Sequence, residues 1–173
     1  MDDLFTAIIA RLTDDLVYHG LNADLAQPPA QKLKYVDMDW GQLDNYPQHP
    51  PAGFPCALLD VRSLNYSDAG NQKQIGLADI EVRIADVVLN NSSSAAPATQ
   101  RANALRNLRL YDAVFQFLHG WVPPNIDYGP LTRISGSRTK RADGIREMRM
   151  VFRVQIPEFK AAQARNLIKV SIV

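Results

Sequence analysis

The sequence is poor in the residues on which many protein chemistries depend. It has one cysteine, Cys56, and three histidines among 173 residues. A single cysteine excludes an internal disulfide and every metal motif that needs several cysteines. His19, His49 and His119 include no two that are spaced as a ligand pair on one element, and a zinc site needs three or four ligands. We therefore expect no metal site and no cofactor.

Long apolar runs and charge of one sign are also missing. No stretch approaches the roughly 18 uninterrupted apolar residues of a membrane-spanning helix, so no membrane partner is expected. The chain begins MDDLFTAIIARLTDD, whereas a secretory signal starts with basic residues, so we expect this segment to stay on the protein. A formal net charge of +1 indicates neither a general nucleic-acid binder nor a disordered acidic chain, and any basic surface must be local.

Catalytic signatures are absent as well. The sequence contains no G-x-S-x-G elbow, no Walker phosphate loop and no G-x-G-x-x-G motif. Nucleophilic catalysis and nucleotide binding therefore have no support, and we expect a protein that is not an enzyme, with no catalytic residues.

Two long hairpins are the clearest features that the sequence does have. In the middle of the stretch 72–90, apolar residues from Ala78 to Ile84 alternate with charged residues with a period of two, which predicts a half-buried strand. A second strand-like run at 56–66 and the polar link 67–71 complete a predicted antiparallel hairpin. Another hairpin is predicted to pair 131–140 with 145–156 across a turn that contains Asp-Gly, a favoured turn dipeptide.

Two helices are predicted between and before these hairpins. Apolar residues repeat every four positions from Leu4 to Leu16, which predicts an amphipathic N-terminal helix. A long central helix is predicted to begin at Pro97 or Thr99 and to end at Gly120. The face of the central helix that we expect to be buried carries Leu105, Leu108, Tyr111, Phe115 and Leu118.

This order predicts an α+β fold in which the N-terminal helix and one long central helix pack on a mostly antiparallel sheet of long hairpins. The run KLKYVDMDW offers one further short strand. A length of 173 residues fits a single domain over 1–173. We expect its core to span 1–157, with 158–173 as a C-terminal extension whose apolar end, LIKVSIV, is an interface candidate.

A proline-rich segment at 41–55 is the first candidate site. Its prolines exclude a helix or an interior strand, so it forms a long loop. Long ordered loops in compact domains usually contact something, and the alternatives are a partner-binding loop and a solvated connector. The interface candidates in this loop are Tyr46, Pro47, Pro50, Pro51 and Phe54.

A cluster of basic residues around the last hairpin turn is the second candidate site. Such a cluster can touch phosphates without reading sequence, or it can bind an acidic partner protein. It can also be a solvated loop tip whose charges keep strand edges from aggregating. The cluster consists of Arg133, Arg138, Lys140, Arg141 and Arg146.

Acidic residues on strands give one enzymatic alternative. Asp60 and the sequence Asp79-Ile-Glu81-Val-Arg83 loosely match the carboxylate clusters that hold magnesium in nucleases. However, Asp79, Glu81 and Arg83 are expected on one sheet face, and alternating charge is typical of any solvated face.

Four stretches together resemble one protein family: GQLDNYPQHPPAGFPCALLDV, QIGLADIEVRIADVVLNN, FQFLHGW and LTRISGSRTKRADGIREMRMVFRV. In this order they are similar to the tail terminator, or tail-completion, proteins of long-tailed phages, in the form carried by prophages as minor tail proteins. The resemblance extends over about residues 1–157. It rests on the order of these stretches and on local sequence similarity within them, and it includes no catalytic signature.

The resemblance implies a structural virion protein without enzymatic activity. Such proteins are α+β domains that close into a ring, typically a homo-hexamer, which caps the finished tail tube and joins it to the head-tail connector proteins. The implied location is the tail or neck of the virion, after synthesis in the bacterial host cytoplasm. DNA passes through such a ring, so the basic hairpin is expected to face either that DNA or acidic surfaces of neighbouring tail proteins. A neck or connector adaptor is the alternative within the same kind of particle.

Overall fold

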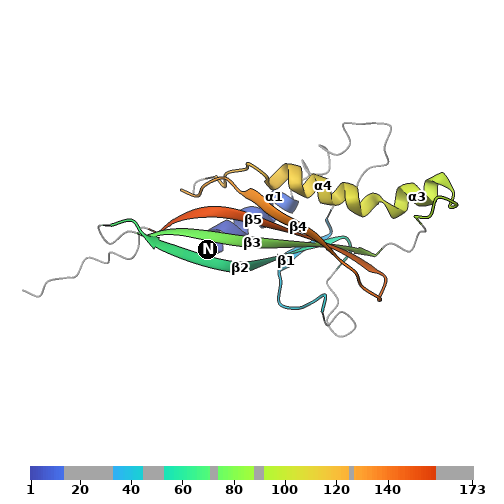
Figure 1. Cartoon of the computed structure of the whole chain (residues 1–173), viewed down its shortest axis with the longest axis horizontal. Helices are drawn as coiled ribbons and strands as arrows, with labels where there is room; N and C mark the ends of the chain where they lie inside the picture. The colour runs from blue at the N-terminus through green and yellow to red at the C-terminus, as the bar shows by residue number, and fades with distance from the viewer. Residues whose placement is uncertain (14–32, 45–52, 71–73, 88–91, 125–126, 159–173) are drawn as a thin grey trace, which may run out of the picture.

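The computed structural model describes residues 1–13, 33–44, 53–70, 74–87, 92–124 and 127–158 (Figure 1). In chain order the elements are α1 (Asp2–Thr13), β1 (Tyr35–Met38), β2 (Cys56–Asp68), β3 (Gln74–Val87), α3 (Ala98–Ala104), α4 (Arg106–Leu118), β4 (Thr132–Thr139) and β5 (Ile145–Glu158).

The strands form one five-stranded sheet in the order β1-β2-β3-β5-β4. Both predicted hairpins are confirmed, because β2 pairs antiparallel with β3 and β4 pairs antiparallel with β5. The two hairpins join where β3 pairs antiparallel with β5 along their whole length. The predicted α+β fold with a mostly antiparallel sheet is therefore confirmed. The short strand β1 is the exception, since it pairs parallel with the first residues of β2.

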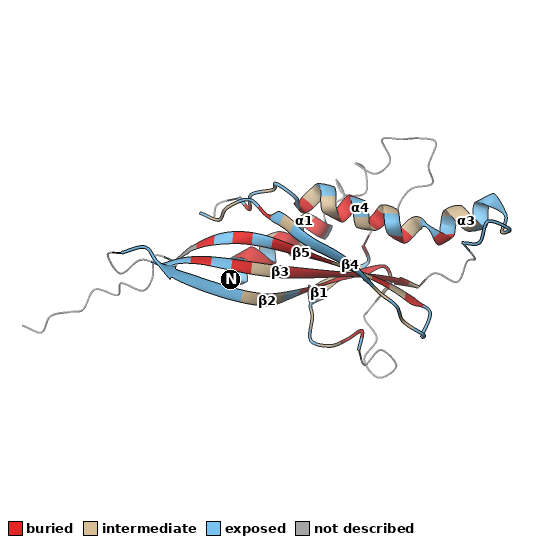
Figure 2. Cartoon of the chain, viewed as in Figure 1, coloured by how far each residue is buried: buried red, intermediate tan, exposed pale blue. Residues whose placement is uncertain are grey.

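Helices α1 and α4 cover one face of this sheet, called here the helix face (Figure 1). The main core lies between these helices and the sheet, and Figure 2 shows buried residues along the middle of β3 and β5. Period-two alternation explains this, because every second strand residue points to the helix face. The largest buried side chains of this core are Leu4, Ile8, Leu12, Leu59, Ile80, Ile84, Leu118, Leu131, Met150 and Phe152.

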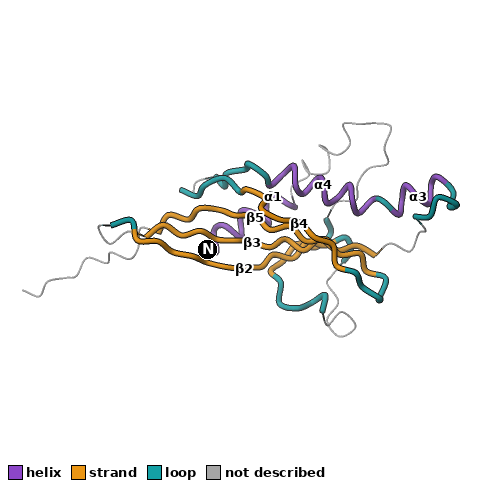
Figure 3. The backbone as a smooth tube through the Cα atoms, viewed as in Figure 1, coloured by secondary structure: helices purple, strands orange, loops and turns teal. Residues whose placement is uncertain are grey.

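A second, smaller core lies on the opposite side of the sheet, called here the open face. Leu43 packs there against Cys56, Leu58, Ala85 and Ile145. The loop that follows β1 brings Leu43 to this position, on the side of the sheet away from the helices (Figure 3). Part of the open face is therefore covered.

The central helix differs from its prediction. It is divided into α3 and α4 at Leu105, whose φ of −95° and ψ of 0° leave the helical range. Leu105 and Leu108 are 44% and 41% exposed, so the expected buried face was wrong at these two positions. The reason lies beneath them: the sheet there presents Asp86 and Arg146, which bind Arg106 and the Ala104 carbonyl and leave no apolar surface to cover. The residues that α4 buries are Asn107, Leu110, Ala113, Val114 and Leu118.

The N-terminal helix is confirmed from Asp2 to Thr13, and its predicted stripe is buried at Leu4, Ile8 and Leu12. Leu16 lies outside the described residues, as does the C-terminal extension beyond Glu158.

Candidate interaction surface

The basic cluster of the last hairpin is divided by the fold. Arg133 lies with its guanidinium 3.6 Å from the centre of the Phe115 ring. Arg146 donates a hydrogen bond of 2.6 Å to the Ala104 carbonyl, between α3 and α4. Both residues therefore hold the central helices on the sheet.

Arg141 is held by ion pairs instead. Its guanidinium pairs with Asp143 at 2.6 Å and with Glu147 at 3.1 Å, and it also donates to the Leu43 carbonyl. The hydrogen bond to Asp143 raises the pKa of Arg141 and lowers the pKa of Asp143. Arg141 therefore closes the hairpin turn onto the loop after β1.

Arg138 and Lys140 remain as the outward cations of the cluster. Both are exposed, and within the described part of the chain neither forms an ion pair. They line an open cavity of about 480 Å³ at the hairpin tip together with Gly144 and Ile145. Of the five residues of the cluster, Arg138 and Lys140 are therefore the two exposed cations that the hairpin offers to a partner.

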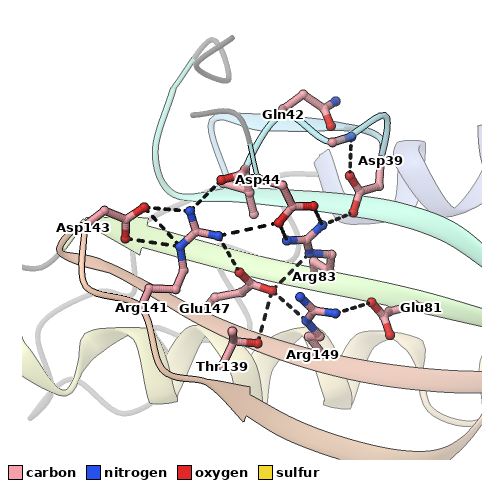
Figure 4. A network of polar contacts seen from close by, with 12 residues as sticks. Asp39, Gln42, Asp44, Glu81, Arg83, Thr139, Arg141, Asp143, Glu147 and Arg149 are labelled. Atoms are coloured by element: carbon pink, nitrogen blue, oxygen red, sulfur yellow. Dashed lines mark hydrogen bonds and ion pairs between the residues drawn. The ribbon is translucent and has the colours of Figure 1, made fainter. Parts of the chain in front are cut away.

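Arg83 on β3 is the centre of a buried ionic network on the open face (Figure 4). Its side chain is 5% exposed and pairs with Asp39 at 2.6 Å, Asp44 at 3.0 Å and Glu147 at 3.1 Å. Two of these carboxylates come from the loop after β1 and the third from β5. One arginine therefore fastens that loop to the sheet.

Glu147 is the second centre of the network, with a fully buried side chain. In addition to Arg83 it accepts hydrogen bonds from Arg149 at 2.7 Å and Arg141 at 3.1 Å, and from the Thr139 hydroxyl. A buried carboxylate with this many donors is satisfied, whereas loss of one partner would leave charge buried without compensation.

The pKa values in the network follow from these contacts. Burial alone would raise the pKa of Glu147, but the hydrogen bonds and charges of Arg83 and Arg149 outweigh it and lower that pKa. The hydrogen bond from Arg83 lowers the pKa of Asp44. The charged form of each carboxylate is therefore the form that the fold stabilises.

The loop after β1 is itself tightly built. Gln42 is fully buried and donates to the Met38 carbonyl, while its side-chain oxygen accepts from the Trp40 N–H. Gly41 has a φ of 92°, which a glycine adopts without strain, and its N–H donates to Asp39. The start of the predicted proline-rich loop is therefore a packed cover of the sheet.

Of the interface candidates in that loop, Phe54 is half-buried against the smaller core. The other four, Tyr46, Pro47, Pro50 and Pro51, lie outside the described residues.

Two of the three carboxylates of the nuclease alternative are held by arginines, and the third, Asp60, is exposed. Asp79 pairs with Arg153 at 2.7 Å, and Glu81 pairs with Arg149 at 3.4 Å. The expectation that Arg83 belongs to a solvated face was wrong, because the loop after β1 covers it. In the ranges that the structure describes, no three histidine, cysteine, aspartate or glutamate side chains come together in a way that could hold a metal ion.

An exposed apolar arm is the feature that sequence reasoning missed. The outer parts of β2 and β3 extend beyond the helices, and Figure 2 shows them largely exposed at the end of the sheet away from the β4–β5 turn. Four large apolar side chains there are between 38% and 45% exposed. Simple alternation does not locate them, because Ile75 and Leu77 are out of phase with the buried positions of β3. In β2, an irregularity between Val61 and Ser63 changes the phase. The four side chains are Leu64, Tyr66, Ile75 and Leu77.

Comparison with known proteins gives no family assignment. No protein-family model and no curated protein matches the chain. One similar solved structure, described as "Virion of native gene transfer agent (GTA) particle", matches over 90% of this chain and 95% of that chain, with 17% sequence identity and a TM-score of 0.49. A similarity at this level is too low to assign a family or a function. Among the described residues, no helix is both long and apolar enough to cross a membrane.

Proposed function

We propose that this chain is a structural protein of a phage-like particle. In this proposal it is a tail terminator that closes into a homo-oligomeric ring, caps the tail tube and joins it to the head connector. The proposal agrees with the resemblance of its four sequence stretches to tail terminators and follows the single-domain organisation expected over 1–173.

The observation that carries the proposal is the apolar arm. Patches of exposed apolar side chains usually mark interaction sites. By the register of β2 and β3, Leu64 and Tyr66 lie near each other on the helix face of the hairpin, whereas Ile75 and Leu77 lie on its open face. An arm of this kind is stabilised when a partner covers it, as in a particle built from repeated subunits.

The hairpin tip supplies a polar contact in the same proposal. Arg138 and Lys140 are exposed and free to pair with acidic groups of the tube or connector proteins. Arg133, Arg141 and Arg146 have structural contacts and serve the partner surface by fixing the shape of the hairpin.

Solution mass by light scattering over a concentration series, with electron microscopy of the heaviest fraction, tests ring formation. We expect closed rings, either alone or after addition of purified tail tubes, and end-on binding to those tubes. A chain that remains monomeric in both conditions contradicts the proposal. Binding to isolated connector rings but not to tubes would place the protein in the neck instead.

A charge-reversal variant tests the contact at the hairpin tip. We expect Lys140→Glu to fold normally, to form rings and to fail in head joining. The matched control is Lys140→Gln, which removes the charge without reversing it and should have a smaller effect. Arg141 is left unchanged in both variants, because glutamate at that position would face the buried Glu147. Arg138 is also left unchanged, because it belongs to the outer edge strand β4.

A further inference from the structure

The sheet has two long outer edges with no partner strand among the described residues. Strand β1 covers β2 only from Cys56 to Leu59, so the rest of that edge is uncovered. Strand β4 is the last strand on the other side. Register shifts at Arg62 and Ile134 bound the regular parts of these edges, which are residues 63–68 and 135–139. An uncovered edge of this kind is a template for strand addition.

The register shows which backbone groups of β4 face outward. The Gln155 carbonyl accepts from the Gly129 N–H, so it points away from β3. The backbone N–H and carbonyl groups of successive residues point to opposite sides of a strand. Those of Val151 and Arg149 therefore also point away from β3 and toward β4. Their partners Ser135 and Ser137 then point toward β5. Gly136 and Arg138 alternate with those two serines, so their backbone N–H and carbonyl groups point outward, away from β5.

The same reasoning applies to β2. The backbone N–H and carbonyl groups of Phe152 and Val154 point toward β3, so those of their partners Ile80 and Ala78 point toward β5. Asp79 and Leu77 must then point toward β2, and their partners on β2 are Ser63 and Asn65. The residues that present outward N–H and carbonyl groups on this edge are consequently Leu64 and Tyr66.

Strand direction makes the two edges compatible in a rotational ring. Neighbouring strands alternate in direction across β2, β3, β5 and β4, so β2 and β4 of one chain are antiparallel. A second copy added by rotation therefore places its β2 antiparallel to β4 of the first copy. Because the edge used on each copy is different, the contact is head-to-tail, which is the kind of contact that forms a ring when the rotation between copies closes.

Side chains next to the two edges are also complementary. Leu64 and Tyr66 share the helix face of β2, where they are 40% and 45% exposed. On the helix face near β4, the exposed Leu105 and Leu108 line a cavity of about 110 Å³ together with Arg138. Pairing the edges would bring exposed apolar side chains of one copy to those of the next.

We propose that the β2 edge of one copy pairs with the β4 edge of the next, so that the sheet continues from subunit to subunit. This inference rests on the proposed ring and specifies its interface. When the outward residues of the β2 edge pair with those of the β4 edge, Leu64 lies opposite Arg138 and Tyr66 lies opposite Gly136. Asn65 then lies opposite Ser137 on the open face, and Asp68 lies next to Arg133.

Disulfide trapping tests this register directly. Asn65 and Ser137 form a pair without mutual backbone hydrogen bonds, in which Cα atoms are about 4.5 Å apart and a disulfide fits. Within one chain β3 and β5 separate the two positions by at least three strand spacings, or about 14 Å, so only a bond between copies can form. Cys56 does not interfere, because it is fully buried and burial raises its pKa to about 12.

The double variant Asn65→Cys/Ser137→Cys is oxidised under the conditions in which the unaltered chain forms rings. We expect a covalent ladder that ends at the ring size, whereas an equimolar mixture of the two single variants should give dimers only. The matched control, Asn65→Cys/Ser135→Cys, carries an exposed second cysteine on the same strand but two residues out of register, and should give no ladder. Rings that form without the expected disulfide overturn the edge pairing and leave the proposed function intact. Failure of the unaltered chain to assemble, with or without tubes, overturns both.

A proline variant separates backbone pairing from side-chain contact. Tyr66→Pro removes an outward N–H, and proline is tolerated at sheet edges. Tyr66→Ala removes the same side chain but keeps the N–H. We expect Tyr66→Ala to assemble at a concentration at least about tenfold lower than Tyr66→Pro requires, while both unfold at similar urea concentrations. Equal assembly of the two variants would contradict strand pairing at this edge.

Discussion

Arg83 holds three segments of the chain together through three carboxylates. Replacing it with leucine leaves Glu147 and Asp39 buried without that partner. Removing one member of a buried ionic group typically costs about 3–5 kcal/mol. We therefore expect Arg83→Leu to lower the free energy of unfolding by an amount in this range, measured by urea denaturation. Its matched control is Arg62→Leu, because Arg62 is 61% exposed and pairs with Glu81 at 3.6 Å, and there the change should stay below about 1 kcal/mol. Similar losses in both variants would contradict a central role for Arg83.

The carboxylates of this network also predict how stability depends on pH. The pKa values of Glu147 and Asp44 are lower in the folded chain than their ordinary values of 4.5 and 3.8. The unfolded chain then binds more protons in this range, so the stabilisation is complete above about pH 5 and is lost as the pH falls through the folded pKa values. Urea midpoints measured between pH 6 and pH 3 should fall accordingly. We expect a shallower fall in Glu147→Gln, and an unchanged profile in that variant would refute the assignment.

At the scale of elements, a close contact between α4 and β4 sets the height of the helix above the sheet. Gly136 has no side chain, and a Cβ there would overlap the Tyr111 hydroxyl. Overpacking of this kind typically costs about 1–3 kcal/mol. We expect Gly136→Ala to destabilise the protein by such an amount in urea denaturation.

The hydroxyl is the source of that overlap, so Tyr111→Phe in the Gly136→Ala background should restore most of the loss. The single variant Tyr111→Phe serves as the control. Additive effects of the two substitutions would show that the contact does not determine the helix position.

The hairpins and the N-terminal helix could be predicted because their determinants are local. Period-two alternation in β3 and β5, and an Asp-Gly turn between β4 and β5, specify an antiparallel pair without knowledge of the rest of the chain. The parallel pairing of the short β1 has no local determinant. The division at Leu105 depends on the polar residues Asp86 and Arg146 beneath the helix, which are distant in sequence.

The ionic network shows the same limit for the candidate site. Alternating charges on β3 look identical in sequence whether the face is solvated or covered. Arg83 is 4% exposed because the loop after β1 places Asp39 and Asp44 against it. Basic residues near the last turn were likewise found by composition, but which of them remain free depends on contacts with Phe115, Ala104 and Glu147.

At the scale of the whole molecule, the two ends of the sheet differ in chemistry. One end is the apolar arm formed by β2 and β3, and the other carries the turn between β4 and β5 with its two free cations (Figure 1). In a head-to-tail ring such a difference gives each subunit a direction. The same direction lets one surface serve the neighbouring subunit and another serve the tube or connector.

The number of free cations decides between DNA and protein as the partner of the hairpin tip. Each phosphate contact contributes about −0.9 to the slope of log K against log salt for duplex DNA. With Arg138 and Lys140 alone, the hairpin of one chain contributes a slope no steeper than about −2, which is a weak interaction at physiological salt. We therefore expect the isolated chain not to retain duplex DNA in about 0.15 M salt, and Lys140→Glu to block head joining nonetheless. Filter binding across a salt series measures the first and head joining in a tail-completion assay the second. DNA retention with a steep slope that the variant abolishes would assign the hairpin to the DNA channel.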